Sequence, residues 1–214
     1  APKPGPGPGP GPGPTLGEIS EINDYGDLVN FASHITYEWT SYDASTDTTS
    51  TSTVTFDDKG DATVGVDICR KFEIEITSDE DTTEIAVWVL KSDWTTIKKL
   101  TIGGIEYSSE YGTWIGPAVF WPYTIFFGWG INWAYVPPEV GTLQYISQAM
   151  ITYGATTLTV NKWLFTPNPA NYPDLSSIDL WQGQTGSYYI LTKFKVTETD
   201  NDYFEFELLE LTMP

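Results

Sequence analysis

Residues able to do nucleophilic or zinc chemistry are scarce in this chain. It contains one histidine, His34, and one cysteine, Cys69. A Ser-His or Cys-His nucleophile needs a base beside it, and a zinc site needs several Cys or His ligands. We therefore expect His34 to be a packed or surface histidine and Cys69 to be a small buried side chain without an internal disulfide. This inventory predicts a protein that is not an enzyme.

Carboxylates are the one plentiful reactive group. Two of them could hydrolyse a glycoside, so a hydrolase stays open as an alternative. They could also bind calcium, which prefers several hard oxygens that converge from a loop. Asp57, Asp58 and Asp61 flank Gly60 in one predicted turn and are the calcium candidates. Their spacing does not match an EF-hand loop, and a solvated hairpin turn is the simpler interpretation, so we expect no cofactor.

The net charge limits the partners that the chain can have. Ten Lys and Arg stand against 29 Asp and Glu, which gives a formal charge of −19. Binding to nucleic acid or to an anionic membrane surface needs clustered basic residues, so neither is expected. The neutral part of the composition, rich in Thr, Ser and Tyr, is typical of exported proteins. Because the chain begins at Ala1 rather than Met, we expect an extracellular or cell-surface location after signal-peptide removal.

Residues 1–14 form a Gly-Pro-rich arm. Every second residue of residues 5–14 is a proline without a backbone donor, which excludes a helix or an inner strand. An extended polyproline II-like arm with a reach of about 40 Å is predicted. It is interpreted either as a segment held by a neighbouring subunit or as a simple spacer.

Residues 111–138 are uncharged and rich in aromatic side chains. The length would suffice for a membrane span, but a span is disfavoured because the segment is interrupted by Gly116, Pro117, Pro122, Gly128 and Gly130. Two other interpretations stay open: a strand pair with a bulged loop inside the core, and a surface buried by another molecule. The second of these, together with the arm, predicts a subunit interface formed by Pro4, Pro6, Pro8, Pro10, Pro12, Pro14, Trp114, Phe120, Trp121, Phe126, Phe127, Trp129, Trp133 and Tyr135.

The positioning elements are predicted to be strands. From residue 33 onward apolar and polar residues alternate with a period of two, most clearly over residues 71–77, where Phe72, Ile74 and Ile76 share one face. We predict an all-β head over residues 33–214, an antiparallel β-sandwich or half-barrel of roughly eight to eleven strands. Residues 15–32 precede it as a connecting or donor segment that could form one or two helical turns.

A processed arm followed by an acidic, Cys-poor β head resembles the subunits of archaeal extracellular filaments, the threads and bundling pili assembled by donor-strand complementation. The resemblance is one of architecture and composition over the whole chain. It implies a homopolymer in which each subunit lends a strand to the next. The Gly-Pro arm lacks the alternating apolar side chains of a donor strand, so residues 15–31 or 203–211 are the better candidates.

Two functions are therefore carried forward. The first is a structural subunit of an extracellular filament or cell-surface assembly, joined through the arm and the aromatic surface. The alternative is an exported β-sheet binding module that holds a lipid, an apolar ligand or a glycan with the aromatic segment.

Overall fold

The alternating segments of the sequence form eleven antiparallel strands in the computed structural model, which describes residues 24–79, 81–111, 136–185 and 188–214. The predicted all-β class is confirmed. The strands of the N-terminal half are β1 (His34–Asp43), β2 (Thr48–Val64), β3 (Asp67–Ser78), β4 (Thr82–Leu90), β5 (Ile97–Ile102) and β6 (Ile105–Tyr107). Those of the C-terminal half are β7 (Gly141–Tyr153), β8 (Thr156–Pro167), β9 (Leu175–Thr185), β10 (Tyr188–Glu198) and β11 (Tyr203–Thr212).

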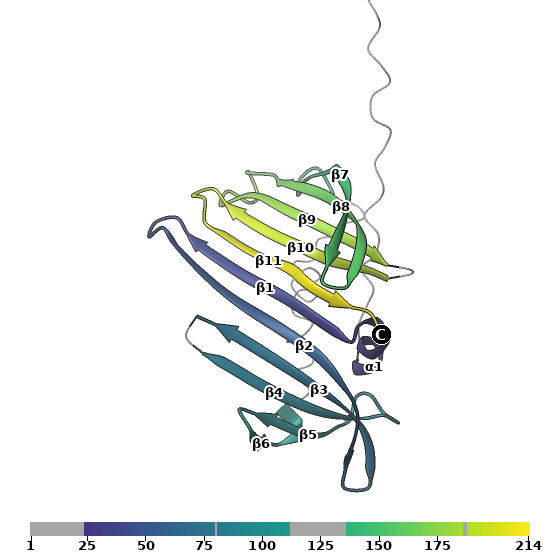
Figure 1. The fold of residues 1–214 in the computed structure, drawn as a ribbon. Coiled ribbons are helices and arrows are strands. Elements are labelled where there is room, and N and C mark those ends of the chain that lie inside the picture. Colours follow the sequence, from purple (N-terminus) through teal and green to yellow (C-terminus); the bar gives the residue numbers. More distant parts are fainter. Residues whose placement is uncertain (1–23, 80, 112–135, 186–187) are drawn as a thin grey trace, which may run out of the picture.

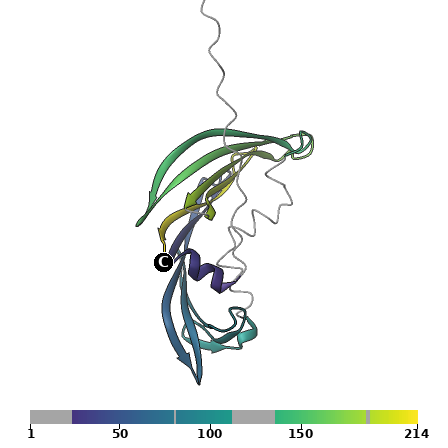
Figure 2. The same cartoon turned by 90° about the vertical axis from the view of Figure 1, so that its right-hand side faces the viewer.

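All eleven strands belong to one sheet, in the order β6-β5-β4-β3-β2-β1-β11-β10-β9-β8-β7. Each half is a meander of hairpins, and the two halves join where the first strand pairs with the last, from His34 opposite Thr212 to Tyr42 opposite Tyr203. Figure 1 shows β1 and β11 side by side in the middle of the sheet. Seen edge-on in Figure 2, the sheet is strongly curved, which corresponds to the half-barrel form of the prediction.

One short helix, α1 (Tyr25–Phe31), lies on the concave side of this sheet (Figure 2). Asp24 is its N-cap, and the Asp24 carboxylate accepts a hydrogen bond of 2.9 Å from the backbone N–H of Asp27. The helix passes so close to Trp94 that a Cβ on Gly26 would come within 2.6 Å of the indole. Gly26 therefore lies inside this helix, and its lack of a side chain allows the close approach to Trp94. A 3₁₀ turn, η1 (Ser109–Tyr111), follows β6.

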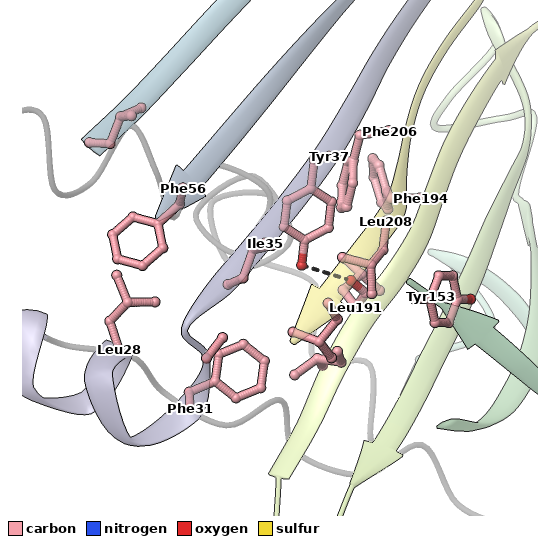
Figure 3. Close-up of a cluster of buried hydrophobic side chains, with 14 of the residues drawn as sticks. Leu28, Phe31, Ile35, Tyr37, Phe56, Tyr153, Leu191, Phe194, Phe206 and Leu208 are labelled. Atoms are coloured by element: carbon pink, nitrogen blue, oxygen red, sulfur yellow. Dashed lines mark hydrogen bonds between the residues drawn. The ribbon is translucent and has the colours of Figure 1, made fainter. Parts of the chain in front are cut away.

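The hydrophobic core fills the concave face between α1 and the central strands. Leu28 and Phe31 of α1 are fully buried, and Figure 3 shows them beside Ile35 and Phe56 of the sheet. Farther along the face the Tyr37 hydroxyl donates to the backbone carbonyl of Leu191 at 3.4 Å, which links β1 to β10. Burial of these side chains removes apolar surface from water and stabilises the curved form of the sheet.

The β7–β8 hairpin bends back toward the centre of the sheet at its tip. Gly154, in the turn, forms an isolated parallel bridge with Leu211 of β11. Tyr153, Leu158 and Val160 of the hairpin are buried. The contact is close, because a Cβ on Gly183 of β9 would lie 2.8 Å from the Leu158 side chain. Strands β7 and β8 therefore contact β11 and β9 through the turn and side chains of their hairpin, in addition to the ladder between β8 and β9.

Candidate functional site

A groove on the sheet lies at the end of the central strands that is remote from α1. Its volume is about 470 Å³, and its lining comes from four adjacent strands, β11, β1, β2 and β3. The lining residues are Trp39, Thr40, Ser41, Ser50, Thr51, Ser52, Ser78, Asp79 and Phe204. This size falls within the range of small-molecule binding sites in proteins.

The strand register explains how the lining is assembled. Trp39 on β1 lies opposite Phe206 on β11 and opposite Ser52 on β2, and Ser52 lies opposite Ser78 on β3. These four residues form one row across the sheet, and they share a face because directly paired residues point to the same side. The row runs from aromatic side chains on β11 and β1 to hydroxyls on β2 and β3.

A second row lies one step nearer the strand ends. Ser41 pairs with Phe204 on one side and with Ser50 on the other. The two serine hydroxyls are 3.0 Å apart and hydrogen-bonded. Along β1 the same face therefore changes from Ile35 and Tyr37 through Trp39 to a serine. Small hydroxyl side chains take the place of bulky apolar ones at this end, and the space that they leave is the groove.

The aromatic side of the groove is continuous with the buried core. The Trp39 ring lies 5.1 Å from Phe204 and 5.5 Å from Phe206, measured between ring centroids. Phe206 stacks in turn on Phe194, and both phenylalanines are buried. Trp39 is only partly buried, and it lines the groove beside these phenylalanines.

The other tryptophans that the structure describes do not line the groove. Trp88 carries the ammonium groups of Lys71 and Lys99 over its ring, at 5.3 and 5.0 Å. Trp181 is covered in the same way by Lys162 at 3.6 Å and Lys193 at 5.1 Å.

The two remaining tryptophans of the described residues are engaged in packing. Trp163 is 3% exposed, and Trp94 packs against the helix at Gly26. Within the described part of the chain, Trp39 is thus the tryptophan that lines the groove.

The described basic residues contact acidic or aromatic side chains of the same sheet. Nine of the ten lie in the described part of the chain, and each contacts a carboxylate or an aromatic ring. They are Lys59, Arg70, Lys71, Lys91, Lys98, Lys99, Lys162, Lys193 and Lys195. For Lys193, burial opposes the charge, but hydrogen bonds to Glu205 and Glu207 outweigh it and raise the pKa of the ammonium group. None of the nine lines the groove, and among its described lining residues Asp79 is the one with an ionisable side chain.

The calcium candidates are engaged with protein cations. Asp58 accepts two hydrogen bonds from the guanidinium of Arg70, at 2.6 and 2.7 Å, and Asp61 accepts from Arg70 and from Lys91. Asp57 contacts His34 and Lys59. In the described residues no three carboxylate, His or Cys side chains are grouped as a metal site would require. The turn predicted here is instead part of the long strand β2, because a bulge between Asp58 and Gly60 lets the ladder with β3 continue.

His34 and Cys69 occupy different environments. The His34 ring is half-buried, with Nδ1 2.8 Å from Asp57 and Nε2 3.2 Å from both Thr36 and Glu210. This Asp-His-Thr order is that of a catalytic triad, but Glu210 shares the nitrogen that a nucleophile would need, and the groove includes none of these residues. Cys69 is fully buried, and burial raises the pKa of its thiol, which disfavours the reactive thiolate.

The interface residues predicted from the sequence, Pro4 to Pro14 and Trp114 to Tyr135, lie outside the described residues. Of the two predicted donor segments, residues 203–211 form most of β11, in the middle of the chain's own sheet. Residues 25–31 of the other form α1, packed on that sheet. No described helix is long and apolar enough to cross a membrane.

Sequence reasoning missed the groove. The period-two pattern does place Trp39 and Ser41 on one face of their strand. Which serines of other strands lie beside them depends on register, which a single sequence does not show.

No protein family and no curated protein matches the chain. Among solved structures it is similar to a DUF1329 family protein from Desulfovibrio piger, with 8% identity over 87% of this chain and 88% of that one and a TM-score of 0.29. It is also similar to a candidate lipoprotein from Parabacteroides distasonis, with 12% identity over 86% of this chain and 96% of that one and a TM-score of 0.28. At these TM-scores the likeness carries no inference about function.

Proposed function

We propose that the protein is an exported, non-catalytic binding module that holds a neutral sugar unit in the groove at Trp39. The observation that carries this proposal is the division of the groove into an aromatic side, Trp39 and Phe204, and a hydroxyl side of serines from β1, β2 and β3. A sugar ring has an apolar face that packs on an indole, and hydroxyl groups around its edge. Ser hydroxyls both donate and accept hydrogen bonds, so they suit those hydroxyl groups.

The hydroxyl groups of the lining favour a sugar over the other ligands considered from the sequence. A lipid chain needs a predominantly apolar cavity, whereas most of the groove residues carry a hydroxyl or a carboxylate. The charge favours a neutral sugar over an acidic one. Asp79 would repel an anion, and the nine described basic residues are already paired elsewhere on the sheet.

The test is isothermal titration calorimetry on the full chain. Neutral oligosaccharides, acidic oligosaccharides and a lysolipid are titrated into it in separate experiments. We expect binding of one or more neutral oligosaccharides. Trp39→Ala should weaken it by roughly 5- to 150-fold, because stacking on one aromatic ring contributes about 1–3 kcal/mol where it has been measured for nucleobases. Trp88→Ala is the matched control, since its ring is covered by lysines and lies outside the groove. Binding of the lysolipid alone, or equal affinity for Trp39→Ala and the wild type, would contradict the proposal.

The filament subunit expected from the sequence is a second proposal. One observation favours it: the sheet of the described residues is open, so β6 and β7 each have a strand partner on one side only. Open edges allow a strand of another molecule to be added. Negative-stain microscopy and size-exclusion chromatography of the full chain, beside a chain that starts at Thr15, test it. Arm-dependent filaments support the proposal, and identical monomer peaks overturn it.

A further inference from the structure

The two edges of the sheet are protected to different degrees. Edge strand β6 has only three residues, one of which is Glu106. Edge strand β7 has thirteen, with the sequence GTLQYISQAMITY, and contains no charged residue and no proline. Ile146 and Met150 of β7 are 52% and 76% exposed. Among the described residues β7 pairs with β8 alone.

Natural proteins usually protect a sheet edge with short strands, lysines, prolines or bulges, because the free N–H and C=O groups attract another strand. In β7 a single bulge at Ile146 is the only such device. Beyond it the pairing with β8 is regular from Ser147 to Tyr153. A long uncharged edge with exposed apolar residues is therefore a surface suited to strand pairing.

We propose that β7 pairs antiparallel with β7 of a second copy of this chain, across a two-fold axis near the middle of the strand. The charge distribution favours a second copy. Two chains of −19 repel each other over most of their surface, but β7 and β8 together contain one charged residue, Lys162, which is positive. Identical antiparallel edges meet here without bringing carboxylates together.

The other edge does not offer an equivalent partner. If β7 paired with β6 of the next copy, at most three of its thirteen residues would gain a partner. When β7 pairs with β7 of a second copy, residues along the whole strand gain a partner in both copies. Such a contact is isologous and closes at two copies, whereas the β6–β7 contact would continue into a filament. The dimer is therefore independent of the proposed sugar site and of the Gly-Pro arm.

The test is light scattering coupled to size-exclusion chromatography, on the full chain over a range of concentrations. We expect a dimer for the wild type and for the chain starting at Thr15. Ile146→Lys and Met150→Lys change exposed side chains, so both variants should fold, as circular dichroism checks, and both should shift the dissociation constant at least tenfold toward monomer. Ile105→Lys on β6 and Val66→Lys in the β2–β3 turn are the matched controls, at 63% and 97% exposure, and should remain dimers.

A cysteine placed near the two-fold axis gives a second, independent measurement. Ser147 is the central residue of β7, so Ser147→Cys should form a disulfide-linked dimer under mild oxidation. The wild type, whose one cysteine is buried, should not. A wild type that is monomeric at all concentrations would overturn the proposal. Dimers abolished by Ile105→Lys but not by the β7 substitutions would overturn it as well, in favour of pairing between the β6 edges of two copies.

Discussion

The ion pair between Asp58 and Arg70 has the most buried carboxylate of the ion pairs among the described residues. The Asp58 side chain is 5% exposed, and it accepts two hydrogen bonds from one guanidinium. Such a planar, two-fold contact fixes the geometry of both side chains. It lies at the bulge of β2, where the Asp58 carboxylate also accepts from the backbone N–H of Gly60. The pair therefore stabilises the irregular point of an otherwise continuous ladder.

Removing the Asp58 charge tests this role. We expect Asp58→Asn to lower the free energy of unfolding by about 2–3 kcal/mol, because hydrogen bonds to a charged group are lost and Arg70 keeps a half-exposed partner only. Urea unfolding at pH 7 measures the change. Asp61→Asn is the matched control: it removes a contact to the same guanidinium, but Asp61 is 50% exposed, so its loss should be much smaller. Equal losses for the two variants would contradict the assignment.

Asp179 is a carboxylate whose position costs stability at neutral pH. Burial raises its pKa, and the nearby Lys195 and Lys193 lower it only in part. Since the folded-state pKa lies above the unfolded value, the native state binds the extra proton as pH falls, and the penalty is complete only above the folded pKa. We expect Asp179→Asn to increase the free energy of unfolding at pH 7 and to have a much smaller effect at pH 3. An effect that does not depend on pH would contradict this explanation.

Helix α1 depends on one capping contact and on its tertiary contacts. At seven residues it is too short to be stable alone, so packing of Leu28 and Phe31 on the sheet holds it. The cap at Asp24 satisfies one backbone donor at its start and places a negative charge at the positive end of the helix. The Gly26–Trp94 approach fixes the distance of the helix from the sheet connection after β4.

Substitution of the cap gives a graded prediction. Asp24→Ala should cost about 1 kcal/mol of unfolding free energy, since the donor of Asp27 loses its partner, whereas Asp24→Asn should retain most of the stability. Thermal unfolding of both variants measures the difference. If Asn is as damaging as Ala, the charge rather than the hydrogen bond is the stabilising feature of this position.

At the scale of the whole molecule, the pairing of β1 with β11 unites two meanders that are distant in sequence. His34 contributes to this seam, because its ring contacts Asp57 on β2 and Glu210 on β11. The two halves share a hydrophobic core in which Tyr37 of β1 bonds to Leu191 of β10 (Figure 3). The seam is therefore central both in the sheet and in the core.

Hydrogen exchange should follow this arrangement. We expect the slowest amide exchange in β1 and β11 and the fastest in β6, because opening the sheet begins at an unprotected edge and reaches the centre last. For β7 the expectation depends on assembly: protection should increase with protein concentration if the strand pairs with a second copy. Amide exchange in β11 as fast as in β6 would contradict the conclusion that the β1–β11 pair is the most protected part of the sheet.

The sequence by itself determined the strand-rich class, because the alternation of apolar and polar residues reflects the pleat of each strand. It also determined the poverty in nucleophiles and the absence of disulfides, since one His and one Cys are countable. It placed Cys69 correctly in the interior. His34, predicted to be a packed or surface histidine, is half-buried. Each of these properties depends on composition or on neighbours a few positions apart.

Tertiary structure alone decided which segments meet. The seam between His34 and Thr212 joins residues from opposite ends of the chain, and the groove joins Trp39 to Ser78 and Phe204. The same holds for Asp58 and Asp61, which resemble part of a turn or a calcium loop in sequence but pair with Arg70 on β3 and, for Asp61, with Lys91 after β4. Register between distant strands is set by how their buried faces pack together, and that information is not contained in any local stretch of sequence.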